Sequence, residues 1–322
     1  MTINKILITG GCGFIGSHIV EYFFKKYSKA KIVVFDKITY AASIKNLDSI
    51  RKNKRVEIIT SDILNYKKLK TASKNCDLVI HAAAESHVDN SFQLNNEFIN
   101  TNVLGTKNVM QACKENKVKK IIHVSTDEIY GEIFNGSFDE NAKFNPSNPY
   151  SSSKAAAEMI VNGYIYSYKL PVIIVRANNI FGTRQHPEKL IAGSCWSFIK
   201  NKKFTIHGKG NQKRSFLYVI DFCNALFILS KKGKNFEAYN IGSSFEYLNK
   251  EIVKLIAIEN NKIFDKNIIY VKDRPFNDFR YSINFQKITK LGWKPKTNLY
   301  SKITEINNWY KKNINRFQKR FT

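Results

Sequence analysis

The sequence predicts an α/β fold, a doubly wound parallel sheet with a smaller C-terminal lobe. Short β-branched runs alternate with helical patterns through the first half of the chain, a glycine-rich stretch separates the first such pair, and the alternation is lost after Ala177. Strands joined by helical crossovers form right-handed βαβ units and hence a parallel sheet. A chain of 322 residues is long enough to bury one large core or two smaller ones.

Six runs read as the strands of this sheet because they are short, apolar and rich in β-branched residues. They cover 5–10, 31–36, 56–62, 77–84, 119–126 and 171–177. Helical spacing of apolar residues predicts helices over 17–27, 101–116 and 150–168.

The rest of the chain predicts the second lobe and one return to the first. Residues 178–214 are loop-rich with one helical stretch at 189–201, whereas 215–232 and 238–242 resemble elements of the first part. We therefore expect a nucleotide-binding domain of 1–177 plus about 215–242, and a substrate-binding lobe of 178–214 and 243–322.

Composition restricts the class of protein. No apolar run approaches the ~20 residues of a membrane span, and the chain leads directly into a strand, which predicts no signal peptide. Five widely spaced cysteines without a CxxC pattern favour a reducing compartment, the cytoplasm. The net charge of +26 is spread over the whole chain, which favours a solvated lysine-rich surface over a nucleic-acid site.

The stretch "TGGCGFIG" predicts a dinucleotide site. Its glycines Gly10, Gly13 and Gly16 stand between a strand and a helix, where a tight turn lets the backbone approach a pyrophosphate at the helix N-terminus. Asp36 ends the second strand twenty residues after Gly16. A carboxylate there accepts hydrogen bonds from ribose hydroxyls and repels a 2′-phosphate, so the sequence predicts NAD as cofactor in a Rossmann-like domain.

Two further patterns carry chemistry. Tyr150 and Lys154 have i, i+4 spacing on a predicted helix, where an ammonium lowers the pKa of a neighbouring phenol and makes it a base.

The strand 119–126 ends in Thr126, followed by Asp127 and Glu128. Adjacent carboxyl groups tend to separate their pKa values, so that one stays protonated while the other ionises. The alternative is that Asp127 and Glu128 mark a strand end exposed to solvent and have no catalytic role.

The glycine loop, Asp36, "HAAAESHVDNS", "STDEIYG" and "PYSSSKA" together resemble the extended short-chain dehydrogenase/reductases. Within them the chain is similar to nucleotide-sugar 4,6-dehydratases, from the first strand to about Trp309. The Thr-Asp-Glu triplet is the most specific element, since the related 4-epimerases lack the Asp-Glu pair and the related decarboxylases lack its Asp.

The resemblance implies a reaction and a site. Tyr150 takes the proton of the 4-hydroxyl of glucose while hydride passes to NAD, Glu128 removes the carbon-5 proton, Asp127 protonates the leaving 6-hydroxyl, and hydride returns to carbon 6. The catalytic set is Thr126, Asp127, Glu128, Tyr150 and Lys154. The implied cofactor contacts are Gly10, Gly13, Phe14, Ile15, Gly16, Asp36, Asp62, Ile63, Ala82, Ala84, Asn102, Tyr150 and Lys154. The implied substrate contacts are Ser86, His87, Asn179, Lys189, Leu190, His207, Arg214, Asn249, Arg274 and Asn277.

Some choices stay open at this stage. "SHVDNSF", "RSFLY" and "PFND" favour UDP-glucose over dTDP-glucose as substrate. Rivals are a 4-epimerase or decarboxylase on the same scaffold and a basic regulatory or nucleic-acid binder that holds NAD only as a ligand. We expect His81, His87 and His123 to be packed rather than metal ligands. We also expect a homodimer through helices 101–116 and 150–168, and no metal.

Overall fold

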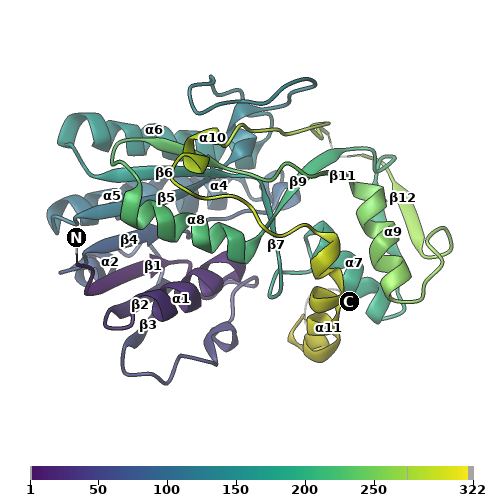
Figure 1. Ribbon diagram of the computed structural model, residues 1–322, viewed down its shortest axis with the longest axis horizontal. Coiled ribbons are helices and arrows are strands. Elements are labelled where there is room, and N and C mark those ends of the chain that lie inside the picture. The colour runs from purple at the N-terminus through teal and green to yellow at the C-terminus, as the bar shows by residue number, and fades with distance from the viewer. Residues whose placement is uncertain (1, 274, 318–322) are drawn as a thin grey trace.

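The computed structural model describes residues 2–273 and 275–317. Its larger domain is a seven-stranded parallel sheet of strand order β10-β6-β5-β4-β1-β2-β3 (Figure 1). The strands are β1 (Lys5–Thr9), β2 (Lys31–Asp36), β3 (Val56–Thr60), β4 (Leu78–His81), β5 (Lys120–Thr126), β6 (Val172–Ala177) and β10 (Ala238–Ile241). The order reverses at β1 and β4, which confirms the doubly wound topology and creates a crevice at the carboxyl ends of the strands.

Helices cover both faces of this sheet (Figure 1). On one face α1 (Phe14–Lys26) packs against α8 (Val219–Lys232), and on the other α2 (Tyr66–Ser73), α5 (Thr106–Glu115) and α6 (Pro149–Tyr168) lie in a row. The two faces form separate apolar clusters, because parallel strands buried on both sides send alternate side chains to opposite layers. The helix expected over 101–116 starts with a π-helical segment, Ile99–Gly105, that runs into α5.

The smaller lobe is built from two short sheets and three helices. One sheet has the order β11-β9-β7 and the other pairs β12 with β8. Their bounds are β7 (Asn179–Phe181), β8 (Phe204–His207), β9 (Lys213–Tyr218), β11 (Glu246–Leu248) and β12 (Ile268–Val271). The helices are α7 (Leu190–Ile199), α9 (Asn249–Glu259) and α11 (Ile303–Asn313).

The remaining elements are short. They are the helices α3 (Val88–Ser91), α4 (Asn95–Phe98) and α10 (Gln286–Thr289), with 3-10 turns at Ile44–Leu47, Asp127–Tyr130, Tyr300–Lys302 and Ile314–Phe317. The chain crosses back to the large domain at Val219 rather than at about 215, because residues up to Tyr218 belong to β9. Later α10 contacts β10, so part of the C-terminal segment also lies against the large sheet.

Candidate active site

A cavity of about 610 Å³ lies where the carboxyl ends of the large sheet face the smaller lobe. The catalytic candidates that line it are Thr126, Glu128, Tyr150 and Lys154, and the cofactor candidates are Gly10, Gly13, Phe14, Ile15, Gly16, Asp36, Asp62, Ile63, Ala82 and Ala84. The substrate candidates are Ser86, His87, Asn179, Lys189, Leu190, His207, Arg214, Asn249 and Asn277. The fold thus brings together residues far apart in the sequence.

Among the described residues, two of the predicted ones do not line this cavity. Arg274 lies outside the described residues. Asn102 is buried behind the wall, where its amide nitrogen donates to Glu85 O at 3.0 Å and to Ser153 Oγ at 2.8 Å. Both amide hydrogens are therefore used inside the protein, and Asn102 holds the loop of Glu85 instead of facing a ligand. Asp127 does not line the cavity itself, although it adjoins Glu128, which does.

Two of the three loop glycines, Gly10 and Gly16, have no room for a side chain. Gly10 has φ +69°, which favours glycine, and a Cβ there would lie 2.8 Å from the backbone of Ala83. A Cβ on Gly16 would lie 2.0 Å from the Gly10 carbonyl oxygen. The first turn of α1 consequently lies directly against the end of β1, with its N-terminal amides at the cavity, as pyrophosphate binding requires.

Asp36 fits the ribose role. Its two carboxylate oxygens accept the backbone N–H groups of Ile38 at 2.7 Å and Cys12 at 2.9 Å, which fixes their direction and leaves lone pairs for further donors. The neighbouring Lys37 faces the carboxylates of Asp62 at 3.4 Å and Glu85 at 3.9 Å. Because this ammonium already has anionic partners, it does not form a site for a 2′-phosphate. The residues present therefore fit NAD.

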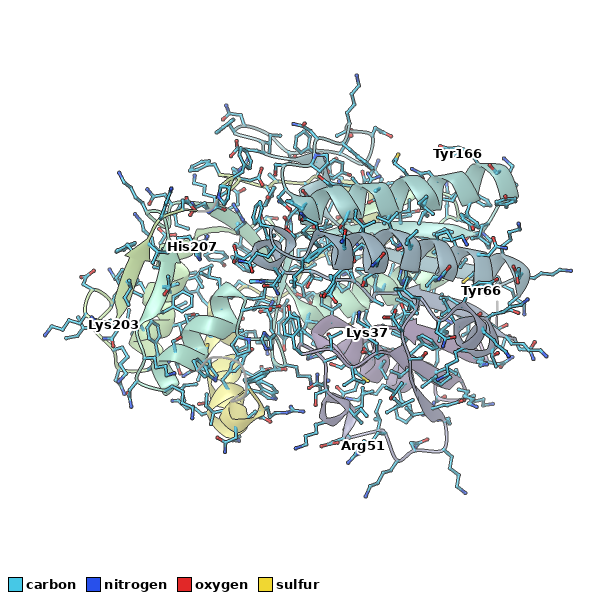
Figure 2. All side chains as sticks on the ribbon, turned by 180° about the vertical axis from the view of Figure 1, so that it is seen from behind. Lys37, Arg51, Tyr66, Tyr166, Lys203 and His207 are labelled. Atoms are coloured by element: carbon cyan, nitrogen blue, oxygen red, sulfur yellow. The ribbon has the colours of Figure 1, made fainter. Side chains whose placement is uncertain are left out.

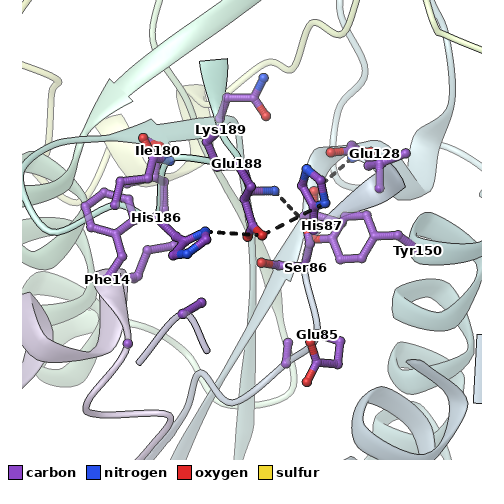
Figure 3. Close-up of a pocket in the computed structure, with 18 of the residues that line it drawn as sticks. Phe14, Glu85, Ser86, His87, Glu128, Tyr150, Ile180, His186, Glu188 and Lys189 are labelled. Carbon is purple, nitrogen blue, oxygen red and sulfur yellow. Dashed lines mark hydrogen bonds and ion pairs between the residues drawn. The ribbon is translucent and has the colours of Figure 1, made fainter. Parts of the chain in front are cut away.

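The two adjacent acids have different surroundings. Asp127 is 3% exposed, and Asn178 Nδ2 donates to its Oδ2 at 2.7 Å. Burial, and then the charge of Glu128, raise the pKa of Asp127 to about 7. Glu128 lies at the cavity (Figure 3), where burial also raises its pKa although the charges of Lys189 and Arg214 oppose that rise. The arrangement supplies one carboxyl group that can stay protonated near neutrality.

The Tyr150–Lys154 pair is held by the start of α6. Asn148 caps this helix in a capping box with Ser151, and Pro149 occupies its first turn. Lys154 Nζ donates to Val124 O at 2.8 Å, and burial lowers the pKa of Lys154 to about 8.

The prediction that Lys154 lowers the pKa of Tyr150 is wrong for the protein alone. Burial is the largest effect and raises the pKa of Tyr150, and the charge of Glu128 raises it further. A side-chain hydrogen bond with Thr126 opposes the rise. A cationic nicotinamide beside the ring would favour the phenolate, which makes the base dependent on the bound cofactor.

The loop after β7 closes over the cavity through charged contacts (Figure 3). Lys189 Nζ donates to Ser86 O at 2.6 Å, and the Glu188 carboxylate lies 3.4 Å from His186 and 4.0 Å from His87. These contacts join the loop after β7 to the segment after β4. The pKa of Glu188 falls to about 2 because His186, Lys189 and His87 outweigh its burial.

Arg214, an expected substrate contact, already has several protein partners. Its terminal nitrogens donate to Lys213 O at 2.8 Å, Phe279 O at 3.1 Å and Asp278 O at 2.7 Å, and the guanidinium packs on the Tyr281 ring at 4.6 Å. In this arrangement Arg214 holds the loop after residue 275 and contributes its charge to the cavity. Bidentate phosphate binding would require several of these bonds to be exchanged.

Several lining residues were not predicted. Asn178, Glu188, Asp278 and Tyr281 all face the cavity. Asn178 and Glu188 directly precede the predicted substrate contacts Asn179 and Lys189 in the sequence, so their position was an available signal. Asp278 lies in "PFND", next to the predicted contact Asn277, whereas Tyr281 owes its position to the fold of the C-terminal segment.

Metal-binding clusters and membrane-spanning helices were also sought in the described part of the chain. Within residues 2–273 and 275–317 no three His, Cys, Asp or Glu side chains are grouped as metal ligands. His81 and His123 are buried on the neighbouring strands β4 and β5 with rings 5.3 Å apart. Across the same ranges, the helices are all too short or too polar to span a bilayer.

Comparison with known proteins identifies the family of this chain. Residues 7–306 match the family model described as GDP-mannose 4,6 dehydratase. A dTDP-D-glucose 4,6-dehydratase of Homo sapiens is 41% identical over 98% of this chain and 92% of its own length. A trifunctional UDP-glucose 4,6-dehydratase of Arabidopsis thaliana is 38% identical over 96% of this chain and 47% of its own.

Solved structures extend the likeness to the whole fold. The crystal structure of a dTDP-glucose 4,6-dehydratase from Streptomyces venezuelae with NAD bound has 32% identity and a TM-score of 0.94, covering 98% of this chain and 99% of that one. The predicted fold class, cofactor and enzyme class are confirmed. The chain belongs to the GDP-mannose 4,6 dehydratase family and is an NAD-dependent sugar-nucleotide dehydratase of the extended short-chain dehydrogenase type.

Proposed function

We propose that this protein removes water from carbons 5 and 6 of a nucleoside-diphosphate glucose and releases the 4-keto-6-deoxy sugar nucleotide. The observation that carries the proposal is the convergence of Glu128, Tyr150 and Lys154 on one cavity with Asp127 buried beside them. An epimerase needs the tyrosine base but has no use for a protonated acid next to a second carboxylate.

The first step oxidises carbon 4. Tyr150 accepts the proton of the 4-hydroxyl, with Thr126 hydrogen-bonded to its phenol and Lys154 at the next turn of the helix. NAD, when bound, would supply the acceptor for the hydride of carbon 4 and its return to carbon 6, and the proton that Glu128 takes from carbon 5 goes back to that carbon. The new ketone makes the proton on carbon 5 acidic.

The second step divides the work between two acids. Glu128 takes the proton from carbon 5, and the electron pair of that bond forms the carbon 5–carbon 6 double bond. The 6-hydroxyl leaves with the electrons of its bond to carbon 6 and receives a proton from Asp127, giving water. A carboxyl group with a pKa of about 7 is protonated in about half of the molecules at neutral pH, whereas an ordinary aspartate is almost fully ionised.

The proposal for the nucleotide has two parts, the class of nucleotide and the preferred member of that class. The names of the relatives support a glucose carried by dTDP or UDP, and the preference for UDP remains our prediction from the sequence motifs. His207, on β8 in the smaller lobe (Figure 2), is the side chain we assign to the base. One methyl group distinguishes the two bases, worth only about 1–3 kcal/mol, so both substrates belong in every assay.

Two further features are proposals. We place the protein in the cytoplasm because its five cysteines, all buried, are free thiols. We also propose a homodimer through the exposed apolar side chains that the π-helical segment and α6 present: Leu104, Met159, Tyr166 and Tyr168.

The test is incubation of the purified protein with UDP-glucose and, separately, dTDP-glucose. Mass spectrometry of the sugar nucleotide is expected to show a product lighter by one water. A product of unchanged mass that chromatographs as the galactose isomer would replace this proposal with a 4-epimerase.

A further inference from the structure

Asp127 stands at the end of a row that crosses three neighbouring strands. In the parallel register Thr126 on β5 pairs with Ala177 on β6, and Ala177 pairs with Ile241 on β10. The next residues along these strands, Asp127, Asn178 and Gly242, therefore lie side by side at the carboxyl edge of the sheet. The row ends at the backbone N–H of Ser243.

Hydrogen bonds run along this row in one direction. Ser243 N donates to Asn178 Oδ1 at 3.0 Å, and Asn178 Nδ2 donates to Asp127 Oδ2 at 2.7 Å. Because a backbone N–H can only donate, the amide oxygen must face Ser243, and the amide NH₂ must face Asp127. Asn178 is 4% exposed, so water does not compete freely for these bonds.

This polarity restricts where a neutral Asp127 can hold its proton. Oδ2 already accepts an N–H, so a proton on that oxygen would meet the Asn178 donor. The other oxygen, Oδ1, accepts from the Thr126 hydroxyl at 3.3 Å, but this hydroxyl, which is also hydrogen-bonded to Tyr150, can rotate to accept a proton, whereas an amide N–H cannot. The available position for the proton is therefore Oδ1, on the side of the catalytic tyrosine.

We propose that Asn178 is a positioning residue for the dehydration step, fixing the acidic proton of Asp127 on the oxygen that faces the departing hydroxyl. The inference rests on the proposed function. Asp127 gives the Oδ1 proton to the 6-oxygen as its bond to carbon 6 breaks, and Oδ2 remains bonded to Asn178, which stabilises the carboxylate that forms. Oxidation of carbon 4 does not use this proton.

Gly242 supports the assignment from a separate observation. A Cβ at this position would lie 2.6 Å from the Asn178 amide oxygen and 3.0 Å from the Phe285 ring. The absent side chain leaves the space in which the amide reaches Ser243. Gly242 does not line the cavity, and the nearest atom to its Cβ position is the Asn178 amide oxygen, which links this glycine to the acid.

The charges around Asp127 set the pH dependence that this role predicts. Glu128 on the same turn and Tyr150 on α6 favour the neutral acid, whereas Arg214 on β9, the Asn178 amide and the Thr126 hydroxyl favour its ionised form. Removing the amide donor therefore raises the pH at which Asp127 loses its proton, by about one unit.

The test compares Asn178→Leu, which keeps the size but lacks both hydrogen-bonding groups, with Gly242→Ala and with the control Ser243→Ala, which retains the backbone N–H. Stopped-flow absorbance of the reduced nicotinamide reports oxidation of carbon 4, and product mass reports water loss. We expect Asn178→Leu to slow water loss at least about tenfold at its optimum while oxidation changes less than about threefold. In this variant the pH above which the rate of water loss falls should be higher than in wild type. Gly242→Ala should show a milder form of both effects.

The outcomes separate the possibilities. If wild-type protein forms no dehydrated product, the proposed function fails and the role of Asn178 fails with it. If wild type is active but folded Asn178→Leu or Gly242→Ala keeps the rate and pH limb of wild type, the positioning role alone is overturned. An equal fall in oxidation and water loss with an unmoved limb also overturns it, since that pattern indicates a structural defect.

Discussion

Asp127 and Glu128 are neighbours in the chain, yet the end of β5 gives one a buried amide partner and the other a cavity. The sequence predicted the pair and its chemistry, because residue types at a strand end are readable from the chain. It could not predict the partner Asn178, since that contact depends on the register of β5 with β6. The raised pKa of Tyr150 was missed for a similar reason, because burial is a tertiary property.

Replacing either acid should slow the loss of water while leaving the oxidation of carbon 4 in place. Asp127→Asn removes the proton donor and Glu128→Gln removes the base, so each is expected to slow water loss by about 10²- to 10⁴-fold. Oxidation of carbon 4 should persist, visible as reduced nicotinamide and a 4-keto sugar that keeps its 6-hydroxyl. Full turnover by both variants would show that the roles are misassigned.

The pKa of Asp127 predicts an alkaline limit. A proton donor must be protonated, so the rate of water loss should fall as pH rises through about 7. The same carboxyl group titrates at 3.8 when unperturbed, so the stability that it contributes is full below that value and is lost as pH rises toward 7. Asp127→Asn should therefore be stabilised relative to wild type at pH 8 but not at pH 4, measured by thermal unfolding. An equal difference at both pH values would contradict the shift.

At the scale of elements, the strands and long helices follow from hydrophobic period, which is why their predicted ranges agree closely with the structure. The spacing of apolar residues along the sequence does not reveal a buried polar contact between two elements. Arg176 on β6 meets Glu158 on α6 at 2.8 Å and Tyr130 at 2.6 Å, with 6% and 0% of the two charged side chains exposed. In the sequence this arginine is only an interruption of an apolar strand.

This buried ion pair should anchor the helix that carries Tyr150 and Lys154. Arg176→Met leaves the Glu158 carboxylate without its partner and is expected to cost about 3–5 kcal/mol of unfolding free energy. Adding Glu158→Gln should recover part of that loss, which urea denaturation can measure. A loss below about 1 kcal/mol in the single variant would mean that the pair does not anchor α6.

The glycine loop offers a matched comparison between two helical glycines. Gly16→Ala should abolish NAD binding because its Cβ would strike the Gly10 carbonyl at 2.0 Å. Gly163 in α6 has no heavy atom within 4 Å of such a Cβ, so Gly163→Ala should leave NAD binding intact and stabilise the helix by about 0.5–1 kcal/mol. Calorimetric titration with NAD checks both, and normal binding by Gly16→Ala would contradict the proposed role of the loop.

At the scale of the whole molecule, the sequence predicted a nucleotide-binding domain and a smaller substrate-binding lobe, and the cavity lies where the carboxyl ends of the large sheet face that lobe. The sequence placed the return to the large domain a few residues early, because "SFLY" reads as a strand and the sequence alone does not say which sheet it joins. The tethering of Arg214 by the loop after residue 275 was likewise beyond its reach, since that loop is brought in from the C-terminal segment.

The proposed dimer can be tested on α6. Tyr166 is 74% exposed and Met159 51% exposed, and Figure 2 shows Tyr166 on the outer side of the helix. A glutamate in place of Met159 would bury a charge in the proposed interface, so Met159→Glu should sediment as a monomer while wild type sediments as a dimer. Lys203→Glu on the smaller lobe is the matched control. A monomeric wild type would contradict the interface.

The most direct test of the account is the mass of the sugar nucleotide made by wild type, Asp127→Asn and Glu128→Gln from UDP-glucose and dTDP-glucose. The account predicts loss of one water by wild type on at least one substrate, and in both variants a 4-keto product that retains its oxygen at carbon 6. Water loss at the wild-type rate in both variants, or an isomer of unchanged mass from wild type, would contradict it.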